Sequence, residues 1–176
     1  MTSSIPLKLR PVEHHAEKPV ALADAARREI DAVIARYPEK RAAMLPVLWL
    51  FEREVGEING EVERQVAALL GVSPAQVREV TTFYTMFRRP GAGTHVVQVC
   101  HTMSCALRGA SQVIAAFREH LGIGPGETTA DGRFSLMKVE CLGACEHAPC
   151  LQVNDVQYDD LTPDRVPGLI QEYRSK

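Results

Sequence analysis

Four of the five cysteines in this chain fall into two spaced pairs that could bind a metal or an iron–sulfur group. Cys100 and Cys105 have four residues between them, and Cys141 and Cys145 have three. Two loops that offer two thiolates each suit either a zinc ion or a 2Fe-2S cluster. The number of ligands therefore leaves both kinds of site open.

The spacing within each pair favours the cluster. Zinc ribbons use cysteines separated by only two residues, whose sulfurs grip a single ion. The looser pairs here suit two sulfide-bridged irons, with one pair on each iron. The small "LGA" between Cys141 and Cys145 would let backbone N–H groups approach the sulfides. The sequence contains no Cys-x-x-Cys motif, so it does not indicate a thioredoxin-type redox pair.

Cys150 and two histidines lie close to these pairs in the sequence. Cys150 follows Ala148-Pro149 and opens an apolar stretch, so we interpret it as a packed free thiol and not as a ligand. His101 and His147 lie inside the cysteine loops, where a hydrogen bond toward the cluster suits them better than ligation. The sequence leaves open whether the bond before Pro149 is cis.

The composition excludes several functional classes. With 45% hydrophobic and 24% charged residues, the 176-residue chain has the composition of a globular protein. Its net charge of -2 provides no cationic field for nucleic acid or anionic lipid. The apolar run at 44–51 is far shorter than the roughly 20 residues of a membrane span. Residues 1–19 lack the apolar core of a secretory signal, so we expect a flexible polar arm and a reducing compartment.

The elements that must position the cysteines follow two different periodicities. Residues 20–89 show the apolar spacing of four helices, which predicts a helical bundle domain. Asn59 and Ser73 are the expected caps of the third and fourth helices, and Trp49 and Phe51 the expected core aromatics. Residues 67–80 resemble a helix-turn-helix, but residues 61–80 carry two arginines against three glutamates, which argues against DNA binding.

Residues 90–176 predict an α/β layer. Strands at 94–100 and 134–141 each run into a cysteine pair, and a helix is expected at 105–122. A hairpin around Asn154-Asp155 and a helix at 162–174 complete the domain. This order of elements indicates a mixed sheet much like a thioredoxin fold, whose strand ends would collect both cysteine pairs at one edge.

The motifs "VTTFYTMF" (80–87), "HVVQVCHTMSCALRGA" (95–110) and "LGIGPGETTADGRFSLMKVECLGACEHAPCLQVND" (121–155) closely resemble one family. It is the small 2Fe-2S subunit of NADH:quinone oxidoreductase, respiratory complex I. The resemblance implies an α+β chain: a helical N-terminal domain, then a thioredoxin-like 2Fe-2S ferredoxin domain. It also implies that Cys100, Cys105, Cys141 and Cys145 are the cluster ligands, with Cys150 outside the cluster.

The resemblance further implies a role within a larger assembly. A neighbouring larger subunit would hold NADH and FMN, and this chain would accept an electron from the reduced flavin. We expect it in the peripheral arm of a complex on the cytoplasmic face of the cell membrane, in a bacterium and not in a mitochondrion. A diaphorase subunit of an NAD-linked hydrogenase or formate dehydrogenase is an alternative, and a zinc-stabilised scaffold is a more remote one.

Overall fold

The computed structural model describes residues 20–176, which separate into two compact units at Pro90–Gly91. The arm expected at residues 1–19 lies outside the described residues. Along residues 20–176, the structure has no helix that is long and apolar enough to cross a membrane.

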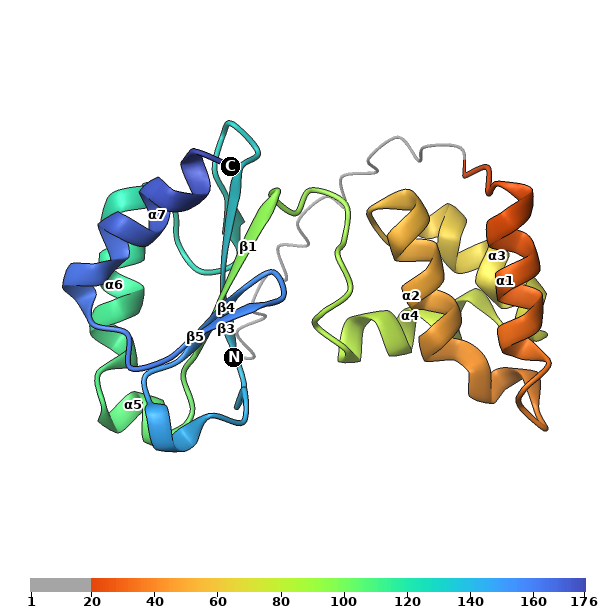
Figure 1. Cartoon of the computed structure of the whole chain (residues 1–176), viewed down its shortest axis with the longest axis horizontal. Helices are drawn as coiled ribbons and strands as arrows, with labels where there is room; N and C mark the ends of the chain where they lie inside the picture. The colour runs from red at the N-terminus through yellow and green to blue at the C-terminus, as the bar shows by residue number, and fades with distance from the viewer. Residues whose placement is uncertain (1–19) are drawn as a thin grey trace, which may run out of the picture. The chain divides into compact units, whose positions relative to one another are not determined.

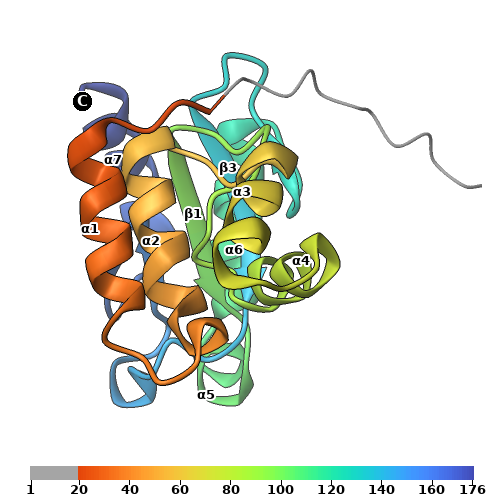
Figure 2. The same cartoon turned by 90° about the vertical axis from the view of Figure 1, so that its right-hand side faces the viewer.

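The first unit is helical, as its periodicity predicts. Its α-helices α1 and α2 lie side by side, with the 3₁₀ helix η1 between them in sequence (Figures 1 and 2). A single hydrophobic core joins all four α-helices, because each contributes buried apolar residues to it. The elements are α1 (Asp24–Ile34), η1 (Lys40–Ala43), α2 (Met44–Val55), α3 (Gly60–Leu70) and α4 (Pro74–Phe83).

The predicted caps of α3 and α4 are confirmed. The Asn59 side chain accepts hydrogen bonds from the backbone N–H groups of Glu61 and Val62, at 3.1 and 3.0 Å. Ser73 and Gln76 form a reciprocal capping box at the start of α4. These bonds satisfy N–H groups that have no partner inside the helix, so they define where each helix begins.

Replacing Asn59 with alanine should lower the free energy of unfolding of the helical unit by about 1 kcal/mol, because two N–H groups lose their acceptor. Thermal unfolding followed by far-UV circular dichroism would measure the loss. Asn59→Ser is the control, since its hydroxyl can still cap the helix. Equal losses in both variants would contradict a capping role.

Two aromatic predictions need correction. Phe51 is fully buried, but Trp49 is 45% exposed and only its ring contact with Phe87, at 5.7 Å, ties it to the core. Two residues apart on a helix, these side chains point in directions roughly 200° apart, so one buries while the other reaches the surface. Helix α4 also ends at Phe83, and Phe87 enters the core from the segment after it.

A buried carboxylate that the sequence did not indicate connects α3 to α4. Glu63 lies on the core side of α3, where its carboxylate forms an ion pair with Arg78 at 2.7 Å. The Thr81 hydroxyl donates to the same carboxylate at 3.3 Å. Buried charges are retained only with partners, so these contacts explain why a glutamate occupies a core position.

The second unit is built on a five-stranded mixed sheet in the order β2-β3-β1-β4-β5. Strands β1 and β3 are parallel, and the remaining neighbours are antiparallel. Helices α6 and α7 pack against each other on one face of this sheet (Figure 1). The strands are β1 (His95–Cys100), β2 (Glu127–Thr128), β3 (Phe134–Val139), β4 (Leu151–Val153) and β5 (Val156–Tyr158); the helices are α5 (Met103–Leu107), α6 (Ala110–Leu121), η2 (Cys145–His147), η3 (Pro163–Arg165) and α7 (Val166–Arg174).

The single helix expected at 105–122 is in fact two helices. Helix α5 ends at Leu107, and α6 begins at Ala110 after Gly109, whose φ of 101° lies outside the helical region. The break gives the segment that carries Cys105 its own direction at the end of β1. The short β2 was also not predicted, and the last helix begins with the 3₁₀ turn η3. The hairpin at Asn154-Asp155 is confirmed between β4 and β5.

Candidate cysteine site

The parallel pairing of β1 with β3 brings both cysteine loops to one edge of the sheet. Cys100 is the last residue of β1 and pairs with Val139, the last residue of β3. Cys141 follows two residues later, and Cys145 opens η2. Helices α5 and η2 contact each other at this end of the sheet (Figure 1). The expected meeting of the two loops is therefore present.

The five sulfurs form a buried group of three and an exposed group of two. Cys100, Cys105 and Cys150 are buried, and their sulfurs all lie within 4.8 Å of one another. The Cys105 and Cys150 Sγ atoms are 3.7 Å apart. Cys141 and Cys145 are exposed, with Sγ atoms 3.3 Å apart. All five are free thiols, so the site has a buried side and a side that reaches the surface.

Hydrogen-bond donors approach the sulfurs from both loops. The Thr102 hydroxyl lies 3.2 Å from Cys100 Sγ, and the Gly143 N–H donates to Cys141 Sγ at 3.4 Å. Gly143 has a φ of 85°, which glycine adopts without the penalty that a side chain would impose. Such donors stabilise negative charge on sulfur, so the loops favour thiolates.

The crowding of the thiols changes their acidity in opposite directions. Burial raises the pKa of Cys100, but hydrogen bonds with Thr102, Cys105 and the Leu142 N–H outweigh burial, and its pKa is lowered overall. Burial raises the pKa of Cys105, and burial with the neighbouring sulfurs raises that of Cys150 to about 12. The hydrogen bond with Cys141 is the main cause that raises the pKa of Cys145. Sulfurs this close ionise together only when a cation lies among them.

These residues fit a group held by four thiolates. Small side chains surround the sulfurs, since Ala110, Ala144 and Ala148 are the buried neighbours of the cysteines. They leave the backbone N–H groups close to the sulfur atoms, which is the environment that tunes iron–sulfur clusters. The donor set is therefore soft, clustered and partly shielded from water.

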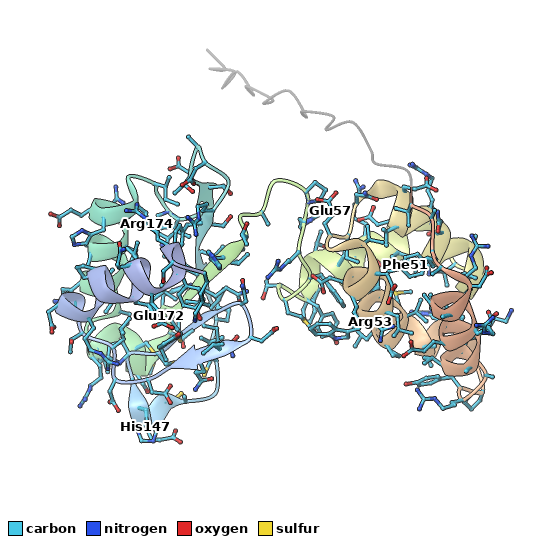
Figure 3. All side chains as sticks on the ribbon, turned by 45° about the horizontal axis from the view of Figure 1, so that its top comes forward. Phe51, Arg53, Glu57, His147, Glu172 and Arg174 are labelled. Atoms are coloured by element: carbon cyan, nitrogen blue, oxygen red, sulfur yellow. The ribbon has the colours of Figure 1, made fainter. Side chains whose placement is uncertain are left out.

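The two histidines of the loops lie beside carboxylates. His101 Nε2 is 3.7 Å from the Glu140 carboxylate, and His147 Nδ1 is 3.3 Å from that of Asp160. His147 lies at the outer end of its loop (Figure 3). The peptide bond before Pro149, whose geometry the sequence left open, is cis.

Three features of the site were missed in the sequence. Cys150 is buried as expected, but it lies beside Cys105 instead of in a separate part of the core. The Thr102 hydroxyl touches a cysteine two residues away, a contact that a Cys-x-Thr spacing could have suggested. Met103 and Leu107 on α5 are 80% and 87% exposed, so an apolar surface adjoins the cysteines.

Comparison with known proteins identifies the family. The family model described as Thioredoxin-like [2Fe-2S] ferredoxin matches residues 30–174. The chain belongs to this family.

Relatives of known name match over most of the chain. A subunit of the NADH-quinone oxidoreductase of Rhizobium meliloti is 42% identical over 85% of this chain and 89% of its own. NADH-quinone oxidoreductase subunit 2 of Thermus thermophilus is 41% identical over 83% of this chain and 82% of its own. The mitochondrial flavoprotein 2 of NADH dehydrogenase [ubiquinone] from Dictyostelium discoideum is 40% identical, and the match covers 84% of this chain but only 61% of that longer protein.

Among solved structures, an air-oxidised NAD+-reducing [NiFe]-hydrogenase has a similar fold. Its TM-score is 0.65 at 18% identity, and the match covers 75% of this chain and 23% of that chain. At this identity the likeness concerns the fold alone.

Proposed function

We propose that this chain is the electron-transfer subunit of the NADH dehydrogenase module of respiratory complex I and carries one 2Fe-2S cluster. The observation that supports this most directly is the convergence of two cysteine loops at the carboxyl ends of β1 and β3. The chain's family is that of thioredoxin-like 2Fe-2S ferredoxins, and subunits of NADH-quinone oxidoreductases are its relatives at about 40% identity.

We assign the four cluster ligands as Cys100, Cys105, Cys141 and Cys145. The last two have adjacent sulfurs on one loop, which suits one iron, and the first two supply the matching pair from the other loop. When bound, such a cluster takes up and releases one electron at a time. The chain's own residues keep water from the buried pair, donate hydrogen bonds to the sulfurs and leave the other pair near the surface.

The position of the exposed pair suits exchange of electrons with a partner. The proposed partner is the larger subunit that holds NADH and FMN, within the peripheral arm on the inner face of a bacterial cell membrane. Relatives that carry NADH-quinone oxidoreductase names support this assignment. The proposed organisation is an arm at 1–19, a four-helix bundle at 20–89 that docks on the partner, and the ferredoxin domain at 90–176.

Iron and zinc analysis of the anaerobically purified chain tests the proposal. About two irons per chain, a brown oxidised form and a spin-half EPR signal after dithionite reduction are expected for one 2Fe-2S cluster. One zinc per chain with no colour and no signal would show instead that the four thiolates are structural.

Replacing Phe83 with aspartate should weaken co-purification with the flavin-bearing subunit by about tenfold or more, because exposed aromatic side chains are frequent anchors of interfaces. Phe83 is 77% exposed at the end of α4, so the change should leave the core and the iron content intact. Val156→Asp, at an exposed apolar position of the β4–β5 hairpin, is the matched control. Undiminished co-purification of the Phe83 variant, with loss in the control, would place docking on the ferredoxin domain.

A further inference from the structure

We propose that Cys150 is a hydrogen-bond donor to the sulfur of Cys105, and that this contact makes the cluster easier to reduce. The inference rests on the proposed function, because it takes Cys105 and Cys100 as cluster ligands. It gives the fifth cysteine a role as a positioning residue that acts through a ligand and does not itself bind iron.

The geometry brings the Cys150 thiol to this sulfur. The two Sγ atoms are 3.7 Å apart, and both residues are buried. The Cys150 carbonyl accepts a hydrogen bond from the Cys100 N–H at 3.2 Å, which attaches the backbone of Cys150 to the end of β1. Because both ends of the contact are held by packed elements, the thiol has little freedom to turn away.

The chemistry of the group of three makes Cys150 the donor. The sulfurs of Cys100, Cys105 and Cys150 lie within 4.8 Å of one another. A cysteine that binds iron does so as a thiolate, which has no proton and can only accept. When Cys100 and Cys105 bind iron, Cys150 is the member of the group that keeps an S–H. Two negatively polarised sulfurs beside it favour that neutral, donating form.

A donor at this place should favour the reduced cluster. An added electron increases the negative charge on the ligand sulfurs, and a hydrogen bond to a more negative acceptor is stronger. The reduced form therefore gains more from the S–H contact than the oxidised form does. The Thr102 hydroxyl, 3.2 Å from Cys100 Sγ, should act in the same direction on the other buried ligand.

The test compares Cys150→Ala and Cys150→Ser in the full chain, purified anaerobically. EPR-monitored dithionite titration measures the midpoint potential, and metal analysis measures the iron content. In Cys150→Ala, the ratio of reduced to oxidised cluster at a fixed ambient potential should fall by about threefold, because a weak donor is lost. Cys150→Ser should stay close to the unmodified chain, since its hydroxyl can still donate.

Two further variants separate hydrogen bonding from packing. Thr102→Val removes the hydroxyl beside Cys100 and should shift the potential in the same direction as Cys150→Ala. Leu142→Ala removes a side chain that packs against the cysteines without removing a donor, and it should leave the potential unchanged. Pulsed ENDOR of the reduced cluster adds a direct signature: a coupling to an exchangeable proton that the unmodified chain and Cys150→Ser show and Cys150→Ala lacks.

The outcomes distinguish failure of the inference from failure of the proposed function. An unchanged potential in Cys150→Ala with its iron retained would overturn the inference and leave the electron carrier standing. Equal shifts in the alanine and serine variants would also overturn it, since packing alone would then explain them. Loss of iron from Cys150→Ala would make Cys150 a ligand. If the unmodified chain binds no iron, the proposed function itself fails.

Discussion

Replacement of Cys141 by alanine should remove most of the bound iron, together with the visible absorption and the EPR signal of the reduced chain. We propose Cys141 as a ligand on the exposed side of the site, with its sulfur 3.3 Å from that of Cys145. Without this thiolate, one iron loses a protein ligand at the place where water has easiest access. The iron content per chain, measured after anaerobic purification, should fall from about two to well under one.

Cys141→Ser should fall between the alanine variant and the unmodified chain, because an alkoxide can bind iron but is a harder ligand than a thiolate. Cys150→Ala is the control, since it removes a cysteine of the same region and should keep the iron. Retention of iron in Cys141→Ala with loss in Cys150→Ala would reverse the ligand assignment. Circular dichroism of each variant verifies that the fold persists.

Phe51→Ala should destabilise the helical unit by about 3–5 kcal/mol and leave the cluster spectrum intact. Phe51 is fully buried in the core that α1 to α4 share (Figure 3), so its removal costs transfer free energy and leaves a cavity. The cysteines belong to the other compact unit, which has cores of its own. Chemical denaturation would report helix loss by far-UV circular dichroism and cluster loss by visible absorption.

Trp49→Ala provides a matched control on the same helix. Its ring is 45% exposed, so we expect a loss of about 1 kcal/mol or less. Simultaneous loss of the helical signal and the visible absorption in Phe51→Ala would show that the two units unfold together. That result would contradict the proposed domain organisation, while a comparable loss in Trp49→Ala would contradict the burial difference.

The site also has a polarity that relates its two sides to different tasks. Cys100 and Cys105 are buried among alanines and receive side-chain contacts from Thr102 and Cys150. Cys141 and Cys145 are exposed, and the apolar Met103 and Leu107 of α5 are exposed as well. In the proposed function, the buried side sets the potential, and the exposed side is the route by which an electron enters from the partner.

The amino-acid sequence by itself determined the features that depend on local chemistry. Apolar spacing placed the four helices, because a helix repeats its buried face every 3.6 residues. Asn59 and Ser73 marked helix starts because their side chains satisfy nearby N–H groups. Strands that end at Cys100 and beside Cys141 indicated that the cysteine pairs would meet, since parallel strands end at one edge.

Only the tertiary structure decided which distant groups touch. Cys150 lies 45 residues from Cys105 in the chain, so their contact depends on the pairing of β4 with β1. Gly93 shows the same dependence: a Cβ there would lie 2.7 Å from the backbone of Phe134, a conflict that no local pattern reveals. Periodicity measures how a segment repeats, but packing against other segments determines which side chain is buried and which sulfur has a neighbour.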